Sequence, residues 1–424
     1  MVTSEGVIQA HRGRNGVYEI MATVPLATRE DLSTYYTPGV AYLCLAIKAD
    51  KEKVYEYTTK ANTIAIISDG TRILGLGDIG PEAGLPVMEG KAILFKRFGG
   101  VDAIPICINT KDEDEIVKFV TQIAPTFGGI NIEDISSPKS FSIAERLSQA
   151  LDIPIFHDDN YGTAIVVLAA LSNAMKLAGK SKDARILING AGSAGLGVAR
   201  LLVFSGFSNI IVFDTKGAIY AGREDGMNKY KAELAAVTNR EGKRGSLPEL
   251  AAGADVLIGF SAKGLFSSGM VRSMNSKAIV FALANPEPEI TYEEATAAGA
   301  FIAATGRSDA PNQVNNMLAF PGVMRGLLDS RARKVTPELL SAAAKAIAGC
   351  VGHRLSQQCI MPDFGDSRMA AKVAAAVAEA VAQEAVRLGI ARRNLRKNEA
   401  RDHAKALLRR YARLERKMLP IEFK

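Results

Sequence analysis

The feature that most constrains the fold is a glycine motif set between an apolar run and an apolar helix. Residues 185–189 predict a β-strand, Gly190-Ala-Gly-Ser-Ala-Gly195 has GxGxxG spacing, and residues 196–204 predict a helix. A second apolar run ends in Asp214, 24 residues after Gly190. This order is typical of a Rossmann unit, in which glycines allow a tight turn, a helix N-terminus binds a pyrophosphate and an acid binds ribose hydroxyls. The predicted dinucleotide contacts are Gly190, Gly192, Ser193, Ala194, Gly195 and Asp214.

Further apolar runs extend this pattern along the chain. Strands are predicted at residues 256–258, 278–283 and 300–304, and a nearly all-apolar helix from Tyr161 is predicted to be buried and to link two domains. Two loops rich in asparagine, at Asn285-Pro286 and residues 309–317, follow strand ends and should face the ligand crevice. We therefore predict an α/β fold with a Rossmann-type parallel sheet and a second α/β domain. The predicted boundaries are residues 1–160, 161–325 and 326–424, the last a set of C-terminal helices.

Two pairs of adjacent acids lie upstream of the glycine motif. Glu133-Asp134 and Asp158-Asp159 each end a short apolar run, and a helix beginning near Ser140 is predicted between them. Such a βαβ unit brings both strand ends to one edge of a parallel sheet. Clustered carboxylates repel one another unless a cation lies among them, and oxygen ligands favour Mg²⁺ or Mn²⁺. The alternative is that the four are solvated loop acids.

A second GxGxxG, at Gly75, Gly77 and Gly80, lacks the context of the first. We predict that Pro81 and Pro86 prevent a long helix from starting there, so that this segment is a loop allowing close approach of a small ligand. Arg72 in this loop could bind a carboxylate. A helix is predicted from Met88, with Lys91 near its start.

Charge is distributed unevenly along the 424 residues. Residues 387–424 hold 13 Lys and Arg against 4 Asp and Glu, whereas the rest of the chain holds 39 against 41, so the excess of +7 belongs to the tail. The segment 392–424 predicts a helix with an apolar stripe at Leu407, Tyr411, Leu414 and Met418, docked on the chain itself or on a sister subunit. Binding of nucleic acid or of an anionic surface is the less favoured alternative.

Cysteine usage and hydropathy bear on the compartment. Four scattered cysteines form no CxxC pair, which favours a reducing cytoplasm, and no run of 18 apolar residues predicts a membrane span. The four histidines are scattered too, which argues against a zinc site.

Taken together, these motifs resemble the malic enzymes, especially the short prokaryotic type, over about residues 8–390. The matching stretches are Tyr35-Tyr-Thr-Pro-Gly-Val-Ala, Arg72-Ile-Leu-Gly-Leu-Gly-Asp-Ile-Gly, Pro86-Val-Met-Glu-Gly-Lys91, Ile132-Glu-Asp, Phe156-His-Asp-Asp-Asn-Tyr-Gly-Thr-Ala and Ala284-Asn-Pro. The segment beyond about residue 392 lies outside the resemblance.

The resemblance implies oxidation of malate by a nicotinamide cofactor, followed by loss of CO₂ to give pyruvate. It implies that Lys91 is the general base with Asp158 tuning its proton affinity, and that Tyr36 is the acid that protonates the enolpyruvate carbon. The other implied roles are metal binding by Glu133, Asp134 and Asp159, substrate binding by Arg72, Asn285 and Asn316, and a cofactor contact by Asn285. It also implies a homodimer or higher homo-oligomer.

Three points stay open at the level of sequence. Asp214 favours NAD, since it should repel a 2′-phosphate, but Lys216 could pair with that phosphate in NADP. A malolactic-type enzyme, which keeps its cofactor and releases lactate, resembles the same family. A binding protein that acts through its basic tail on a dehydrogenase scaffold is the alternative from another class.

Overall fold

The computed structural model describes residues 3–12 and 16–418 and contains two separate β-sheets. The first sheet has four parallel strands in the order β2-β1-β3-β4. Their bounds are β1 Thr63–Ser68, β2 Asp102–Cys107, β3 Gly129–Ile132 and β4 Ile155–His157. Helix α7 (Lys139–Ala150) connects β3 to its neighbour β4, which confirms the predicted βαβ unit and brings both acid pairs to the same sheet edge.

Helix α5 (Pro81–Gly99) corrects the prediction that the two prolines prevent a helix from starting at residue 81. Pro81 occupies the first turn, where its missing N–H has no helical partner to lose, and the helix also accommodates Pro86. The long helix places Lys91 near its middle rather than near its start, where the side chain is buried. Helix α6 (Glu113–Ile123) follows β2.

The second sheet has six strands in the order β10-β9-β8-β5-β6-β7, parallel except for the short β7. Its strands are β5 Ile186–Asn189, β6 Ile210–Asp214, β7 Gly217–Ala218, β8 Val256–Gly259, β9 Ile279–Ala282 and β10 Ile302–Thr305. The accompanying helices are α9 Ser193–Phe204, α10 Lys229–Ala235, α11 Leu247–Ala251, α12 Ser268–Ser273 and α13 Tyr292–Ala297. The predicted α/β class with a Rossmann-type sheet is confirmed.

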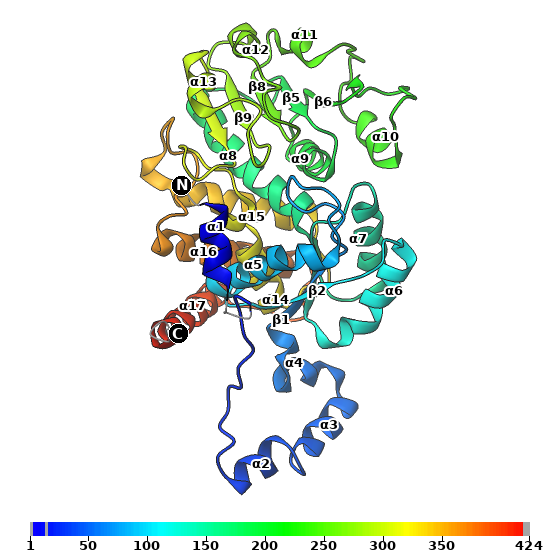
Figure 1. Ribbon diagram of the computed structural model, residues 1–424, viewed down its shortest axis with the longest axis vertical. Helices are drawn as coiled ribbons and strands as arrows, with labels where there is room; N and C mark the ends of the chain where they lie inside the picture. The colour runs from blue at the N-terminus through cyan, green and yellow to red at the C-terminus, as the bar shows by residue number, and fades with distance from the viewer. Residues whose placement is uncertain (1–2, 13–15, 419–424) are drawn as a thin grey trace.

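Helix α8 (Thr163–Ala178) connects the two sheets (Figure 1). Among the described residues, the stretch Asp158–Ala178 is long and apolar enough to cross a membrane, yet 72% of its most apolar window is buried inside the protein. A core helix that is apolar on all sides has this property. The domain boundaries at residues 160 and 325 stay predictions.

The C-terminal helices are α14 Phe320–Ser330, α15 Pro337–Val351, α16 Ser367–Arg387 and α17 Glu399–Met418. Three of these four helices, α14, α16 and α17, contact α5, and α15 packs on α16 and α8. Helix α17 also contacts α14 and α16. The tail helix therefore docks on its own chain, one of the two predicted options. The predicted stripe was wrong in part: Ala400, Ala404 and Leu408 are the buried positions of the described side chains of α17, whereas Leu414 is 38% exposed. Residues 419–424 and the side chain of Met418 lie outside the described part.

The N-terminal helices α2 (Arg29–Tyr35) and α3 (Val40–Ala49) project from the body (Figure 1). Neither helix has a buried residue, and apolar side chains such as Leu32 and Tyr42 are 51% and 74% exposed. We call residues 27–49 the arm. The remaining short helices are α1 Ser4–His11, α4 Val54–Tyr57, η1 Lys51–Lys53, η2 Thr59–Ala61, η3 Ala124–Thr126, η5 Asn316–Leu318, η6 Gly352–Arg354 and the π-turn η4 Asp158–Gly162.

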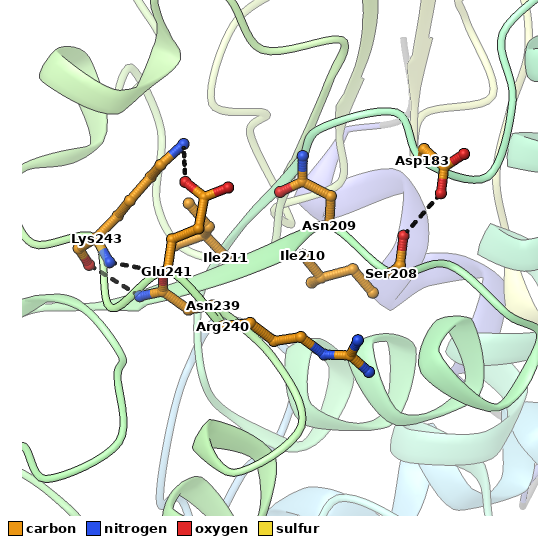
Figure 2. Close-up of a pocket in the computed structure, with 9 residues that line it drawn as sticks. All are labelled: Asp183, Ser208, Asn209, Ile210, Ile211, Asn239, Arg240, Glu241 and Lys243. Atoms are coloured by element: carbon orange, nitrogen blue, oxygen red, sulfur yellow. Dashed lines mark hydrogen bonds and ion pairs between the residues drawn. The ribbon is translucent and has the colours of Figure 1, made fainter.

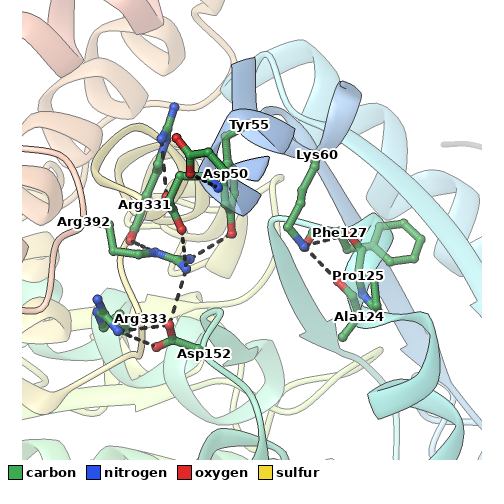
Figure 3. Close-up of polar contacts among 11 residues, drawn as sticks. Asp50, Tyr55, Lys60, Ala124, Pro125, Phe127, Asp152, Arg331, Arg333 and Arg392 are labelled. Carbon is green, nitrogen blue, oxygen red and sulfur yellow. Dashed lines mark hydrogen bonds and ion pairs between the residues drawn. The ribbon is translucent and has the colours of Figure 1, made fainter. Parts of the chain in front are cut away.

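The base of the arm is fixed to the body by polar contacts (Figure 3). The Lys60 ammonium donates to the carbonyls of Ala124, Pro125 and Phe127, and Arg392 donates 2.8 Å to the Tyr55 hydroxyl. The guanidinium groups of Arg392 and Arg331 also lie over the Tyr55 ring. The segment that follows the arm is thus held on the body by Tyr55 and Lys60, whereas the two helices of the arm bury no residue.

Candidate active site

The four predicted acids meet where β3 and β4 end. A carboxylate oxygen from each of Glu133, Asp134 and Asp159 lies within 4.8 Å of the other two, and the residues are buried or half-buried. Asp159 Oδ2 accepts a hydrogen bond of 2.9 Å from the Asp134 backbone N–H. Asp134 itself has a positive φ of 51°, a turn conformation that redirects the chain at the end of the strand. The predicted convergence of the two pairs is confirmed in its geometry.

The electrostatics of this cluster fit a cation. Burial and the neighbouring Glu133 raise the pKa of Asp134 to about 7, and burial together with Glu133 and Asp134 raises the pKa of Asp159 well above its ordinary value. Asp134 Oδ2 is buried and has no hydrogen-bond partner among the described residues. Three hard oxygen donors that repel one another, one of them unsatisfied, match the ligand preference of Mg²⁺ or Mn²⁺.

Lys91 lies against the cluster from α5. Its ammonium is 2.6 Å from Asp158 Oδ2 and 2.8 Å from Glu133 Oε1, and it lies 4.3 Å from the centroid of the Phe320 ring. Burial disfavours the charge, but the two carboxylates outweigh it and raise the Lys91 pKa above its ordinary value. In the metal-free protein Lys91 is therefore protonated.

Asp158 is fully buried and organised by its neighbours. Asn316, from η5, donates 2.5 Å to the same Oδ2 that Lys91 contacts, and a Cβ added to Gly162 would lie 2.0 Å from Oδ1. Position 162 thus has no room for a side chain. Burial raises the pKa of Asp158 to about 6, although the Lys91 charge opposes the increase.

Two side chains of the site escaped the sequence analysis. Asn131 donates 2.8 Å to Glu133 Oε2, so Glu133 is held from one side by Asn131 and from the other by Lys91. Its place in β3, two residues before Glu133 and on the same face, was a usable signal. Phe320 contacts Lys91 from α14, some 230 residues away, and nothing in its local sequence indicated this role.

The predicted substrate contact Arg72 lies on a loop beside Asp134, and Asn285 lies on the loop that follows β9. Arg72 donates its backbone N–H to the Asp134 carbonyl and its guanidinium 3.2 Å to the Leu74 carbonyl, leaving the side chain exposed. Asn285 is exposed after β9, and a Cβ added to Gly75 would lie 3.1 Å from its carbonyl oxygen. The Gly75 loop and the Asn285 loop, from the two different sheets, therefore face each other closely.

The glycine turn after β5 has the predicted geometry. Gly190 has φ 113°, which other residues rarely adopt, and a Cβ on Gly195 would lie 1.7 Å from the Gly190 carbonyl oxygen. Asn160 Nδ2 donates 3.1 Å to the Ser193 carbonyl, so the turn that carries Asp158 and Asp159 is fastened to the start of α9. The acid cluster and the dinucleotide turn are consequently neighbours. Gly192 is the residue just before α9, and Ala194 is the second residue of that helix.

Asp214, at the end of β6, does not act as a lone acid. Arg223 donates to both of its oxygens and Lys231 approaches Oδ2 at 2.6 Å, while Lys216 pairs with Asp225. These donors outweigh burial and lower the pKa of Asp214. The positive charges of Arg223 and Lys231 therefore largely compensate the repulsion expected between Asp214 and a 2′-phosphate. The sequence pattern did not connect either residue to Asp214.

Tyr36 is the one predicted catalytic residue that the fold keeps apart. It caps α2 on the arm and is 66% exposed, whereas Lys91 and the acids lie in the body (Figure 1). A single chain does not bring Tyr36 to Lys91.

A polar hollow of about 290 Å³ in the second sheet is not part of this site (Figure 2). It lies at Ile210, where β6 begins, and ligands of doubly wound sheets bind at the opposite, carboxyl edge. Its Lys243 already pairs with Glu241 at 2.8 Å.

Comparisons with known proteins show which family the chain resembles. Residues 15–148 match the malic enzyme N-terminal domain and residues 161–386 match the malic enzyme NAD-binding domain. The chain is 50% identical over 375 residues to a bifunctional malic/malolactic enzyme of Bacillus subtilis, covering 88% of this chain and 92% of the relative. It is 51% identical over 360 residues to an NAD-dependent malic enzyme of Geobacillus stearothermophilus, covering 84% and 75%.

A solved structure gives the same answer. The malic enzyme of Pyrococcus horikoshii superposes with a TM-score of 0.93 at 46% identity, covering 98% of both chains. Two matched domains in the expected order and a relative of this similarity over nearly its whole length leave one family. The chain belongs to the malic enzymes.

Proposed function

We propose that this chain oxidises malate to pyruvate and CO₂ with reduction of NAD or NADP, that it needs Mg²⁺ or Mn²⁺, and that it also decarboxylates oxaloacetate. The observation that carries the proposal is Lys91, held by Asp158 and Glu133 beside three carboxylates suited to a divalent cation. A metal bound by Glu133, Asp134 and Asp159 would acidify the malate hydroxyl and stabilise the electron pair released on decarboxylation.

Lys91 is the proposed base for the malate hydroxyl proton. A base must be neutral, and the two anions that hold the Lys91 proton oppose this. Committing the Glu133 charge to a cation would remove one of them. Asp158, which is not among the three proposed ligands, then controls how readily Lys91 gives up and regains its proton.

The substrate carboxylates have proposed partners on three segments. Arg72 offers an exposed guanidinium next to Asp134, Asn285 lies on the facing loop, and Asn316 already donates to Asp158. Asn285 is also the proposed contact to the nicotinamide cofactor. Because these residues come from both sheets, closing the two loops on malate would exclude water from the reacting atoms.

We propose further that the enzyme is a homodimer or higher homo-oligomer in which the arm completes the site of a second copy. The arm exposes Leu32, Tyr35 and Tyr42 and buries no residue, a state that is unfavourable in water. Tyr36, the proposed acid, lies on this arm and not beside its own Lys91. A second copy of this chain would bury the exposed apolar side chains of the arm, and its Lys91 site would give Tyr36 a substrate to protonate.

The test is the absorbance at 340 nm with malate, Mn²⁺ and either cofactor, with pyruvate and lactate measured at the end. Net NADH or NADPH formed in step with pyruvate is the expected result. Lactate without net reduced cofactor would instead support the malolactic reaction, which the Bacillus subtilis relative makes the second candidate.

A further inference from the structure

A second pocket, of about 580 Å³, lies away from the acids and the glycine turn, between α8, α9 and α15. Its walls combine apolar side chains with lysines. The apolar part includes Leu168 and Met175 of α8, Phe204 at the end of α9 and Phe207 just beyond it. The Phe204 side chain is 45% exposed, and exposure of so large an apolar ring to water is unfavourable.

The charged side chains that line this pocket are all basic, and serines make up the rest of its polar lining. The lysines that line it are Lys176, Lys180, Lys182 and Lys345, and no acidic residue of the described chain lines it. Lys180 is fixed by Asp255 at 2.6 Å and Lys182 by the Ser205 carbonyl at 2.6 Å. Lys176 and Lys345 form no ion pair within 4 Å in the part of the chain that the structure describes.

Glu384, an acid that interacts with the Lys345 charge, is already paired with another cation. Glu384, whose carboxylate feels the Lys345 charge, makes a two-pronged ion pair with Arg387 at 2.6 and 2.9 Å. The hydroxyl of Ser205, which also lines the pocket, is buried and has no hydrogen-bond partner among the described residues. Lys176 and Lys345 are therefore the two exposed cations that a ligand can reach.

Two of the three helices that line this pocket, α8 and α9, begin at the catalytic region. Helix α8 follows the turn of Asp158 and Asp159 directly, and α9 begins at the glycine turn with Ser193. With 16 and 12 residues, these helices are about 24 and 18 Å long. A ligand at their far ends can therefore bias the position of both elements that form the active site.

We propose that this pocket is an effector site for a small amphiphilic anion, in which an aromatic or acyl group packs on Phe204 and Phe207 and a phosphate, sulfonate or carboxylate pairs with Lys176 and Lys345. The volume is within the range of small-ligand pockets, and a charge-free ligand would leave the basic rim unused. The proposal is independent of the chemistry assigned to Lys91.

The probe is 8-anilinonaphthalene-1-sulfonate, and N-phenyl-1-naphthylamine, the same ring system without the sulfonate, is its neutral control. The chain has no tryptophan, so the probe fluorescence is free of energy transfer from that residue. The double variant Lys176→Gln/Lys345→Gln should weaken sulfonate binding at least about tenfold, the loss expected for charged hydrogen bonds. Lys334→Gln, an exposed lysine just before α15, is the matched control and should leave it unchanged.

Coupling to the active site is measured by binding alone. Some of the probe binding should be absent from the double variant, and this part reports on the proposed site. The affinity of that site for the probe should change at least about threefold when NAD is saturating, because coupling between two sites is reciprocal. Equal binding by the neutral control, or equal affinity in wild type and double variant, would overturn the site. Probe binding that is lost in the double variant but indifferent to NAD would overturn its effector role. Neither readout depends on turnover of malate.

Discussion

The Lys91 ammonium lies 2.6 Å from the Asp158 carboxylate although 67 residues separate them, and Asn316 donates to the same oxygen from a third segment. This contact joins the middle of α5 to the turn before α8. It makes the proton on Lys91 depend on the charges around Asp158, and the predictions below start from that dependence.

Lys91 and Tyr36 should separate two half-reactions. Lys91→Ala should reduce malate oxidation more than metal-dependent decarboxylation of added oxaloacetate, because only oxidation needs a base at the hydroxyl. Tyr36→Phe should show the reverse, since protonation of the enol carbon needs an acid. Each effect should be about 10²–10⁴-fold. Both reactions are assayed in both variants with a metal-free blank, and equal losses everywhere would refute the division.

Tyr36 should act on the site of the partner copy. Lys91→Ala and Tyr36→Phe chains, each inactive in malate oxidation to pyruvate, should regain activity when mixed, unfolded and refolded together. In a mixed dimer one of the two sites then has an intact Lys91 and an intact Tyr36, so up to about a quarter of wild-type activity is expected from random pairing into dimers. Mixtures that stay at the level of the separate variants would show that each chain uses its own Tyr36.

The stability of the metal-free protein should fall with rising pH. The pKa of Asp134 is raised from 3.8 to about 7 in the folded state, so its contribution is full below about pH 4 and is lost as the pH rises through 7. Thermal unfolding in EDTA between pH 5 and 8 measures this.

Two variants define the source of that pH dependence. Asp134→Asn should flatten the slope and lose the stabilisation that Mn²⁺ gives the wild type, because one charged oxygen ligand is gone. Asp114→Asn, an exposed acid with 84% side-chain exposure, should behave as wild type. Parallel slopes for wild type and Asp134→Asn would contradict the assignment.

Cofactor preference should depend on the balance of charge at Asp214. We expect NAD to be preferred modestly in the wild type, and Asp214→Ser to shift preference towards NADP by freeing Lys231 and leaving Lys216 available. Lys231→Gln should raise the KM for NADP at least about tenfold with little effect on NAD, since a charged hydrogen bond contributes about 1.5–3 kcal/mol. Kinetics with both cofactors test this, and a wild type that favours NADP would overturn the first statement.

The tail helix should contribute stability through Leu408. Leu408→Ala, at a side chain 6% exposed, should lower the free energy of unfolding by about 2–5 kcal/mol. Leu414→Ala, six residues on and 38% exposed, should change it by less than about 0.5 kcal/mol. Denaturant unfolding of both variants gives the answer, and catalysis should persist in each. A larger loss at Leu414 would restore the stripe predicted from sequence.

Much of the fold and of the site could be predicted from local sequence alone. Strand ends that deliver Glu133-Asp134 and Asp158-Asp159 follow from apolar runs, and the βαβ rule then brings them to one edge. The turn at Gly190 follows because its φ and the contact with Gly195 exclude side chains. These features are encoded within about 30 residues of chain, where spacing and backbone geometry dictate the outcome.

Only the tertiary structure decided the contacts between distant segments. The helix start at Pro81 was misjudged because a proline costs nothing in a first turn and packing sustains the rest. These contacts depend on which helix faces which neighbour. They are the contact of Phe320 with Lys91, the ion pairs of Arg223 and Lys231 with Asp214, and the burial of Leu408 rather than Leu414. The position of Tyr36 on an unpacked arm also depends on the tertiary structure. Burial and ion pairing are properties of the assembled surfaces, so no local pattern carries them.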